Sequence, residues 1–517
     1  MVFLQVQVRK PFLPVWGMYF HSLIELANKF NLACTGPMKF LWFFNLVLAF
    51  SVFSTSVADS HSSRPNIVLV MADDQGIGDM GYTGHPVIQT PNFDRASRGG
   101  IRFDQFYAAA PVCSPTRASV LTGRHPNRMG VFKWGYPMRP QEITIAEVLR
   151  EHGYSTAHFG KWHLGSVRHN SPAHPGANGF DEWVSAPNFY DNDPILSHQG
   201  KAVQHQGESS VLAVDLAIQW IEQKVAASDP FFAVVWFGSP HSPHRAAAED
   251  QALYADHPDR LKHFFGEVTG MDRAFGKLRD RLEVLGVRKN TLLWYCSDNG
   301  ALPNVGSTNG YRGNKSKVYE GGLRVPSFLE WPDRIKIPRA VQTRSQTCDI
   351  LPTILDWLDI DIPKNRNLDG ISLVPYLTRS TRLRKAPIGF WDYPAKGIST
   401  PSAKWMSELF EAQKNGGDLE PDIQSQNSAL LPNPKYSDGT FPGHAAWIDG
   451  DLKLHRIENQ KGQVKWELYH LKSDPAESRD LMVESNASFN RRQLSQLKEG
   501  LHSWLESVVD SLNGEDY

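Results

Sequence analysis

Three uninterrupted apolar runs constrain the fold of this chain more than any other feature of its sequence. They read NIVLVM (66–71), FFAVVWF (231–237) and TLLWYC (291–296). Successive side chains of a strand point to opposite faces of a sheet, so a strand that is apolar throughout must be covered on both faces. Such strands are typical of a parallel sheet with helices on either side. The runs therefore predict the centre of a large, mostly parallel sheet flanked by helices.

The segments between and after these runs predict an α/β fold with two parts. Helical spacing of apolar residues spans 143–152, 209–226 and 261–285, and a short strand-like segment spans 155–159. Strands that alternate with helices in this way are typical of α/β domains. We assign residues 59–385 to this domain.

The residues beyond it, 386–517, have a different character. They contain short strand-like segments and a final helix, which predict a smaller α+β domain with an antiparallel sheet. Within this part, residues 395–445 are rich in Pro, Gly, Ser and Asn. That composition predicts a long loop or insertion.

The N-terminal part of the chain has the pattern of a secretory signal peptide. From Met38 it has one lysine, an apolar run over 40–53 and small residues up to Ala58. This order predicts a signal peptide over 38–58, preceded by an upstream extension over 1–37. The apolar run is short for a membrane span, although an uncleaved anchor is the alternative. We expect a soluble protein that is periplasmic or secreted, without stable membrane insertion after signal cleavage.

The overall charge argues against a nucleic acid or an anionic membrane as partner. Charged residues make up 21% of the chain, and its formal net charge is −1. Binding to such polyanions normally relies on a strongly basic surface. An anionic ligand must therefore be held by cations gathered at one site.

Reactive side chains directly follow each of four predicted strands. The segments are ADDQG, GKWHLG, GSPHSPH and SDNG. In open α/β sheets, ligands bind where the carboxyl ends of the strands meet. We therefore expect one crevice to gather the following side chains: Asp73, Asp74, Lys161, His163, His241, His244, Asp298 and Asn299.

Four of these residues form a candidate metal-binding set. Asp73, Asp74, Asp298 and Asn299 offer only oxygen ligands. Oxygen donors suit a hard cation such as Ca²⁺ or Mg²⁺, whereas zinc prefers nitrogen and sulfur. The alternative is that both segments are merely turns and helix caps.

A cysteine stands beside a predicted helix start in the segment CSPTRASVLTGR. Ser114 suits the N-cap, Pro115 the first helical position and Gly123 the residue after the helix. The free N–H groups of a helix N-terminus favour an anion, and Arg117 adds a positive charge one turn inside. The residues alone indicate an anion site with an activated thiolate at Cys113, the alternative being a free structural thiol.

The same segment resembles the signature of the formylglycine-dependent sulfatases, the type I arylsulfatase-like family of the alkaline phosphatase-like superfamily. The pattern C-x-P-x-R followed by L-T-G-R is intact here. GKWHLG, PHSPH, SDNG and NKSKVYEGGLRVP are also similar to family segments and stand in the family's order. WELYHLKSDPAE resembles its closing segment, so the resemblance runs from about residue 64 to the C-terminus.

The resemblance implies an alkaline phosphatase-like fold and a modified nucleophile. A separate formylglycine-generating maturation enzyme would oxidise Cys113 to formylglycine. One hydroxyl of the hydrated aldehyde would attack sulfur, and the other would later expel inorganic sulfate. The side chain at 113 would also touch one divalent cation, typically Ca²⁺ with Mg²⁺ as the alternative, held by the four oxygen-donor residues.

The resemblance also implies roles for the basic residues. Arg117 would steady the hydrated aldehyde, while Lys161 and Lys315 would neutralise sulfate oxygens in the transition state. His241 would protonate the leaving alcohol and bind substrate, and His163 would assist collapse of the sulfated hydrate.

Two assignments keep alternatives. Lys317 competes with Lys315 for the role of the family's lysine ahead of YEGG. His244 would contact substrate, or it would be an ordinary loop histidine.

The resemblance implies a sulfatase acting on sulfate esters of a carbohydrate. One alternative is a phosphonate or phosphate ester hydrolase of the same superfamily. Another is a non-catalytic protein that binds sulfated glycans and in which Cys113 stays unconverted. Trp405 and Phe410 of the expected loop form a hypothesis for a sugar-binding cleft.

Overall fold

The computed structural model describes residues 64–364, 366–377, 383–419, 435–483 and 490–517. All of them belong to one compact unit. The predicted upstream extension and signal peptide, residues 1–58, lie outside the described residues.

A ten-stranded sheet forms the centre of the described part of the chain, with the order β11-β2-β10-β9-β1-β8-β4-β5-β6-β7. Its strands are β1 (Asn66–Ala72), β2 (Ile101–Phe103), β4 (Ser155–Lys161), β5 (Glu182–Ala186), β6 (Ile195–His198), β7 (Lys201–Gln204), β8 (Phe231–Trp236), β9 (Thr291–Ser297), β10 (Ser327–Glu330) and β11 (Arg339–Val341).

The three apolar runs are neighbours at the middle of this sheet. Strand β1 pairs in parallel with β8 on one side and with β9 on the other, and β4 pairs in parallel with β8. All three runs are buried along their whole length. The prediction of a mostly parallel sheet is confirmed for its centre, and among the described strands the antiparallel pairs are β2–β10, β9–β10, β5–β6 and β6–β7.

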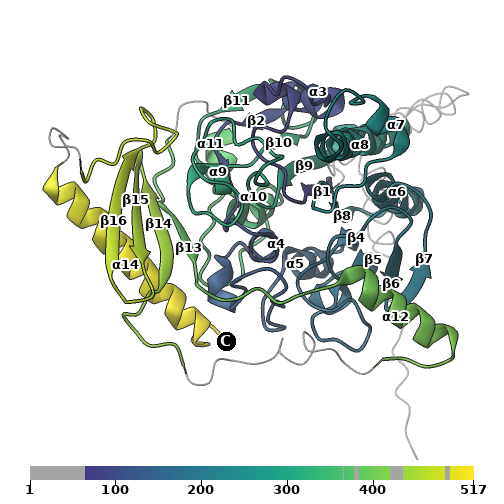
Figure 1. Ribbon diagram of the computed structural model, residues 1–517. Coiled ribbons are helices and arrows are strands. Elements are labelled where there is room, and N and C mark those ends of the chain that lie inside the picture. Colours follow the sequence, from purple (N-terminus) through teal and green to yellow (C-terminus); the bar gives the residue numbers. More distant parts are fainter. Residues whose placement is uncertain (1–63, 365, 378–382, 420–434, 484–489) are drawn as a thin grey trace, which may run out of the picture. The chain divides into compact units, whose positions relative to one another are not determined.

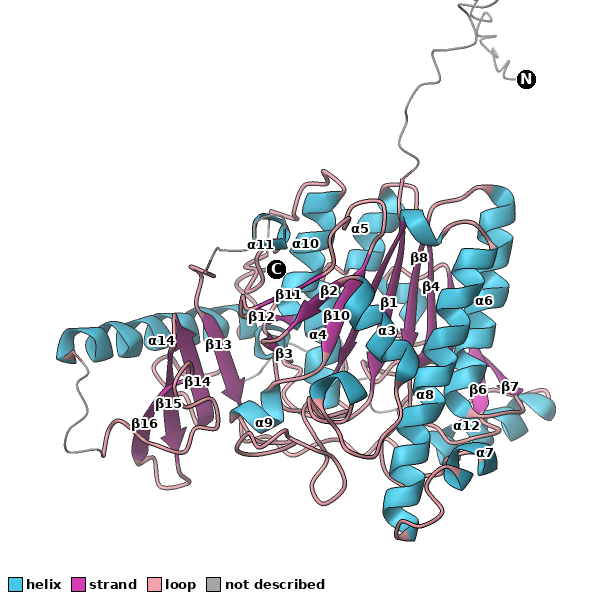
Figure 2. Cartoon of the chain, turned by 90° about the horizontal axis from the view of Figure 1, so that it is seen from above, coloured by secondary structure: helices cyan, strands magenta, loops and turns pink. Residues whose placement is uncertain are grey.

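Helices cover both faces of the sheet (Figures 1 and 2). One face packs against α3 (Pro91–Gly99), α6 (Ser209–Ala227) and α8 (Asp259–Val284). The other packs against α4 (Cys113–Thr122), α5 (Ile145–Glu151) and α10 (Ile350–Trp357). Alternate residues of β1 belong to the two cores, which is why the strand is apolar at every position from Ile67 to Ala72.

Shorter elements complete the α/β part. They are a two-stranded sheet of β3 (Phe106–Tyr107) and β12 (Ser345–Gln346), and the short helices α7 (Ala248–Ala252), α9 (Glu320–Leu323) and α11 (Val374–Leu377).

A second, antiparallel sheet follows in the C-terminal part (Figure 1). Its strands β13 (Ile388–Asp392), β14 (Gly443–Asp449), β15 (Leu452–Glu458) and β16 (Val464–His470) pair in chain order. Helix α14 (Arg491–Leu512) lies along one face (Figure 2), where Leu501 and Leu505 share a core with Leu454 and Leu468. This confirms the predicted antiparallel sheet with a final helix.

The expected loop at 395–445 is wrong for part of its length, because Ser402–Lys414 form the helix α12. Met406 and Leu409 of this helix are buried in the core, and Phe410 packs against the same core. The composition averaged over residues 395–445 does not show the short apolar stripe of this helix. Phe410 is partly buried, and its place in a sugar-binding cleft stays a hypothesis. Residues 420–434 lie outside the described part.

Among the described residues, none of the helices combines the length and the apolar character that crossing a membrane would require.

Candidate active site

The predicted site residues lie at the carboxyl ends of four adjacent strands. Asp73 and Asp74 follow β1, Lys161 ends β4 and Asp298 follows β9. His241 comes from the loop after β8. Because these strands are neighbours in the order β9-β1-β8-β4, the side chains converge at one edge of the sheet.

Cys113 is the first residue of α4 and lies fully buried at this edge. The N-cap is Val112, not Ser114 as predicted. The hydroxyl of Ser114 instead accepts a hydrogen bond from the Gly135 backbone N–H at 2.9 Å, so it is used in a tertiary contact. Gly123 ends the helix in the left-handed conformation, as predicted.

Cys113 and the carboxylates form a compact group. Ligand atoms of Asp73, Cys113 and Asp298 lie within 4.8 Å of one another, and so do those of Asp73, Asp74 and His241. The Asp74 backbone N–H donates to Asp298 Oδ1 at 3.0 Å, which joins the ends of β1 and β9.

Two oxygens of this group have unused acceptor capacity. The Nδ2 group of Asn299 donates to Asp74 Oδ1 at 2.9 Å. The amide oxygen of Asn299, Oδ1, is buried as well. Among the described residues, neither Asn299 Oδ1 nor Asp73 Oδ1 has a hydrogen-bond partner. Buried oxygens without donors are costly unless a cation or a polar group satisfies them. The donor set therefore fits a hard divalent cation.

Three cations balance the three carboxylates. Arg117 contacts Asp298 through Nε at 3.0 Å and Nη2 at 2.7 Å. Lys161 Nζ lies 2.7 Å from Asp73 Oδ2.

Lys315 Nζ lies 2.5 Å from Asp74 Oδ2. The competing Lys317 is exposed and acts electrostatically on Asp392 instead. Of the two lysines, the structure brings Lys315 into the group.

The electrostatics of the group follow from its burial. Burial raises the pKa of Asp73 even though Lys161 lies beside it. Burial also opposes ionisation of Asp74, but Lys315 and then His241 outweigh it and hold the pKa of Asp74 below its usual range. Asp74 is therefore a carboxylate at neutral pH.

The thiol of Cys113 does not behave as its position at a helix start suggested. Burial raises the pKa of Cys113 above its usual value, although Lys161 and Lys315 act in the opposite direction. The thiol stays protonated at neutral pH, so an activated thiolate is not what this environment supports.

The histidine His241 faces the group from the side of β8. Its Nε2 lies 3.6 Å from Asp74 Oδ2, and its Nδ1 is 2.6 Å from the Ser242 carbonyl oxygen. That contact requires Nδ1 to carry the hydrogen, so Nε2 is the acceptor nitrogen of the ring. Burial lowers the pKa of His241 to about 3, so the ring is neutral at neutral pH. The ring stacks on Phe189 with 4.3 Å between centroids.

His163 also lies in the group. Its backbone is left-handed, with φ of 57°, and neither ring nitrogen has a partner among the described residues. Burial, with Lys161 next, keeps the pKa of His163 well below its usual value. The ring is therefore neutral.

His244 lies against another element. Its Nδ1 is 3.0 Å from Glu267 Oε2, and its ring packs edge-on against Phe264 of α8. These contacts favour the interpretation as a structural loop histidine.

Sequence reasoning missed two aromatic residues at the site. Phe189 supports His241, and Trp236 lies under the Arg117 guanidinium, 5.1 Å from it. Trp236 stands within the apolar run 231–237, a pattern that by itself indicates core packing. No periodicity marks Phe189, so only the tertiary structure identifies it.

The comparisons with known proteins agree with this geometry. The profile of the Sulfatase family matches residues 65–360, more than half of the chain. N-acetylgalactosamine-6-sulfatase of Mus musculus is 32% identical over 403 residues, which cover 69% of this chain and 73% of the relative. An ulvan-active sulfatase of Formosa agariphila is 27% identical over 369 residues, which cover 67% of this chain and 71% of that protein.

A solved structure shares the fold. The structure of Ps i-CgsB in complex with k-i-k-neocarrahexaose has a TM-score of 0.70 and 24% identity, and the match covers 87% of this chain and 97% of that one. With the family profile and the curated relatives, this likeness leads to one conclusion. The chain belongs to the sulfatase family and is a sulfuric ester hydrolase of the alkaline phosphatase-like superfamily.

Proposed function

We propose that this protein is an exported sulfatase that removes sulfate from a sulfated carbohydrate, with formylglycine at position 113 and one divalent cation. The observation that carries the proposal is the convergence of Cys113, Asp73 and Asp298 at the start of α4. The carbohydrate class is supported by the two curated relatives, which are named for N-acetylgalactosamine and ulvan.

The metal ligands in this proposal are Asp73, Asp74, Asp298, Asn299 and the modified side chain at 113. Ca²⁺, or Mg²⁺ in its place, would polarise a sulfate oxygen as a Lewis acid. Because the three carboxylates are already balanced by Arg117, Lys161 and Lys315, two further positive charges make the site attractive to an anionic ester.

The remaining side chains act on the sulfate group and the leaving alcohol. Lys161 and Lys315 donate to sulfate oxygens as negative charge develops on them. Arg117, held by Asp298 and by the Lys161 carbonyl oxygen at 3.0 Å, keeps a fixed positive charge beside position 113. His241 would protonate the leaving alcohol from Nε2, which must first take up a proton, because burial lowers the pKa of His241 to about 3 and the neutral ring holds its hydrogen on Nδ1. His163 would serve the release of sulfate from the modified side chain.

Burial of Cys113 dictates when its modification takes place. The residue is 1% exposed, and all of α4 is buried around it. A maturation enzyme cannot reach the sulfur in the folded protein, so conversion to formylglycine precedes folding of this helix.

The mass of the tryptic peptide from Phe103 to Arg117, taken from protein made in its native host, tests the nucleophile. The proposal expects the mass of the aldehyde form at position 113. An unmodified cysteine, in a host that contains the maturation enzyme, would contradict it.

Turnover of an aryl sulfate and an aryl phosphate, measured side by side, tests the reaction class. We expect a clear preference for the sulfate. Preference for the phosphate would indicate a phosphate or phosphonate ester hydrolase, and inertness toward both would indicate a glycan-binding protein.

A further inference from the structure

A buried ionic cluster joins the C-terminal sheet to the loop that carries Lys315. It consists of Glu320, Lys453, His455 and Glu477, and we refer to it as the Glu320 cluster. Lys453 Nζ lies 2.9 Å from Glu320 Oε1 and 3.0 Å from Glu477 Oε1. His455 Nε2 lies 2.7 Å from Glu477 Oε1, and none of the four side chains is more than 1% exposed.

Charge and hydrogen bonding are well matched inside the cluster. Burial opposes the charge on Lys453, but Glu320 and Glu477 outweigh it and raise the pKa of Lys453 above its usual value. Burial, with Lys453 next, keeps the pKa of His455 well below its usual value. The neutral His455 therefore donates from Nε2 to Glu477 and accepts at Nδ1 from His444, 2.8 Å away.

Glu477 fastens the cluster to the backbone of the catalytic part. Its Oε2 accepts from the Glu320 backbone N–H at 2.6 Å. The residue itself has a φ of 52°, a left-handed conformation that is unfavourable for a side chain of this kind. Such a conformation persists when the surrounding contacts determine it, as the bonds to Glu320, Lys453 and His455 do here.

The two glycines after Glu320 connect the cluster to the loop 312–317, which carries Lys315 and which we refer to as the Lys315 loop. The Gly321 N–H donates to the Arg312 carbonyl oxygen at 2.7 Å. A Cβ at Gly321 would lie 2.3 Å from the Gly313 oxygen, and one at Gly322 would lie 2.0 Å from the Lys317 oxygen. The loop from 312 to 317 therefore rests directly on these glycines.

The far side of the same loop meets the end of β9. The Lys315 N–H donates to the Ala301 carbonyl oxygen at 2.9 Å, and the Gly300 N–H donates to Gly322 at 3.0 Å. Gly300 follows Asn299 directly, so one continuous set of contacts connects the Glu320 cluster, the Lys315 loop and the candidate metal ligands.

A second set of contacts holds the start of the loop. The Arg312 guanidinium lies 3.9 Å from the Tyr319 ring centroid and donates to the Tyr469 hydroxyl at 2.6 Å. The Tyr319 hydroxyl donates to Glu467 at 2.9 Å. Both Glu467 and Tyr469 belong to β16, so the C-terminal sheet contacts the start of the loop in addition to the Glu320 cluster at its end.

We propose that the Glu320 cluster positions Lys315 for catalysis, which makes Lys453 and His455 of β15 and Glu477, which follows β16, positioning residues supplied by the C-terminal part of the chain. The inference rests on the proposed role of Lys315 at the sulfate group. The long side chain of Lys315 reaches Asp74 only if its loop backbone is held in place. The C-terminal sheet is thus a part of the active-site framework.

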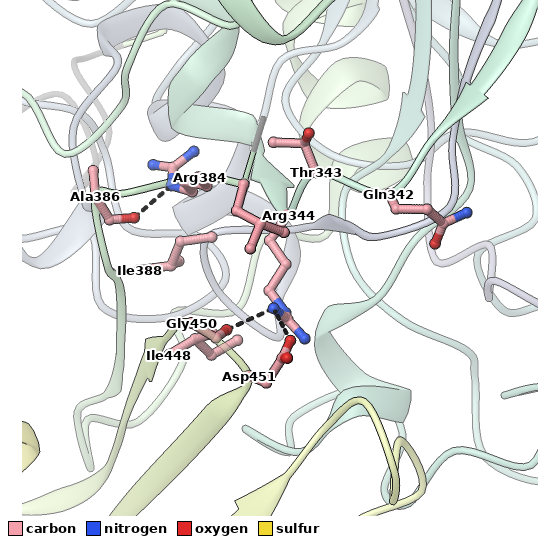
Figure 3. Close-up of a pocket in the computed structure, with 10 residues that line it drawn as sticks. Gln342, Thr343, Arg344, Arg384, Ala386, Ile388, Ile448, Gly450 and Asp451 are labelled. Atoms are coloured by element: carbon pink, nitrogen blue, oxygen red, sulfur yellow. Dashed lines mark hydrogen bonds and ion pairs between the residues drawn. The ribbon is translucent and has the colours of Figure 1, made fainter. Parts of the chain in front are cut away.

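The structure also offers a matched control at a different junction. Arg344, which precedes β12, donates to the Gly450 carbonyl oxygen at 2.5 Å and to Asp451 Oδ1 at 3.0 Å. Figure 3 shows this contact at the β14–β15 turn, where it borders a small pocket. It ties the same sheet to the same α/β part, but within the described part of the chain no hydrogen bond or ion pair of Arg344 reaches the Lys315 loop.

The test compares Glu477→Gln, and the smaller change Tyr319→Phe, with the control Asp451→Asn. All variants are measured as metal-loaded enzyme in which Cys113 has been converted to formylglycine. We expect kcat/KM on an aryl sulfate to fall about tenfold or more for Glu477→Gln, because small displacements of a charged group in an active site are costly. Asp451→Asn should keep the wild-type value. Equal losses in both, or none in Glu477→Gln, would overturn the proposal.

A double-mutant cycle separates positioning from general destabilisation. If Glu477 acts through Lys315, Glu477→Gln combined with Lys315→Met is no slower than Lys315→Met alone. Additive losses would mean that Glu477 acts by another route. Should Glu477→Gln fail to fold, the same cycle with Tyr319→Phe gives the answer.

Hydrogen exchange of the backbone amides at 315 and 321–322 gives a readout that needs no activity. We expect faster exchange there in Glu477→Gln and unchanged exchange in Asp451→Asn. If the wild type hydrolysed no sulfate ester, the proposed function would be wrong. The exchange rates would still show whether Glu477 holds the Lys315 loop in place. Unchanged exchange in an enzyme with sulfatase activity would refute the positioning role alone.

Discussion

At the scale of single residues, the charges of the site are arranged in pairs that differ in accessibility. Arg117 and Lys161 are fully buried against Asp298 and Asp73, whereas Lys315 is 15% exposed. Removing a buried partner leaves an uncompensated carboxylate, which destabilises the fold as well as the chemistry. Lys315 is the most exposed of the three cations, but its removal also leaves the buried Asp74 without its main partner, so stability must be measured beside activity.

Replacing Lys315 by Met should lower kcat/KM for an aryl sulfate by about a hundredfold or more, because a donor to the developing charge is lost. Lys317→Met is the matched control two positions away, and its exposed side chain predicts near wild-type rates. Steady-state kinetics with thermal unfolding of both variants checks this. A larger loss in the Lys317 variant would reverse the assignment.

His241→Asn should show a dependence on the leaving group. An alcohol of high pKa needs a proton as it departs, whereas nitrophenolate leaves without one. We expect the variant to lose about a hundredfold or more on a sugar sulfate and far less on 4-nitrophenyl sulfate. Equal losses on the two substrates would indicate that His241 binds the sulfate group and does not donate a proton.

At the scale of secondary-structure elements, α12 shows how a region of loop-like composition still builds core. The helix packs on β6 and β7, and its buried positions Met406 and Leu409 are three residues apart. That spacing places both on one face of the helix. The side-chain oxygen Oε1 of Gln413 in α12 also accepts a hydrogen bond from the Ala202 N–H of β7 at 2.8 Å, which connects the helix to the edge of the sheet.

Leu409→Ala should therefore lower the free energy of unfolding by about 2–5 kcal/mol, as expected for a fully buried leucine. Ser407→Ala, on the exposed face of the same helix, should change it by less than about 0.5 kcal/mol. Denaturant unfolding of the two variants gives both values. A small effect at Leu409 would mean that α12 contributes little to the core.

At the scale of the whole molecule, bound metal and buried carboxyls set how stability responds to conditions. The candidate cation site joins the ends of β1 and β9 to the start of α4, so a bound ion links three elements of the core. Outside the site, Glu267 is a further buried carboxyl, held by the His244 ring and by the Arg245 N–H at 2.7 Å.

Chelation should lower the Tm of the protein, and Ca²⁺ should restore it. A ligand that binds only the folded state contributes about 2.7 kcal/mol at a hundred times its Kd. Asn299→Ala should reduce this shift, because Asn299 Oδ1 is one of the proposed ligands. A Tm that is insensitive to chelation in the wild type would contradict a cation at this site.

Glu267 should make stability fall as pH rises from about 4.5 to 7. Burial raises the pKa of Glu267 to about 7, from an ordinary value of 4.5. The folded state therefore holds a proton that the unfolded state releases, and this advantage is lost as pH rises through the folded-state pKa. Across that range the wild type should lose up to about 3 kcal/mol more than Glu267→Gln.

Unfolding by denaturant at several pH values measures this difference. The exposed Glu249→Gln is the control and should follow the wild type. Parallel pH profiles for wild type and Glu267→Gln would show that Glu267 is ionised in the folded state throughout.

The central strands, the edge of the sheet where the site lies and the residues that gather there could all be predicted from the amino-acid sequence. These features are local: an apolar run covers one strand, and the residue after it must lie at the strand's end. The motif around Cys113 is local too, which is why the family could be recognised before the fold was known.

The pairing of the charges, the packing of α12 and the contacts between the C-terminal sheet and the Lys315 loop could not be predicted in this way and follow from the folded chain. Lys453 and Glu320 are separated by 133 positions, and no pattern in either sequence segment predicts that they form an ion pair. The protonated state of Cys113 was decided in the same way, because burial outweighs the helix start. Desolvation and ion pairing depend on distances through space, and those distances arise only when the chain has folded.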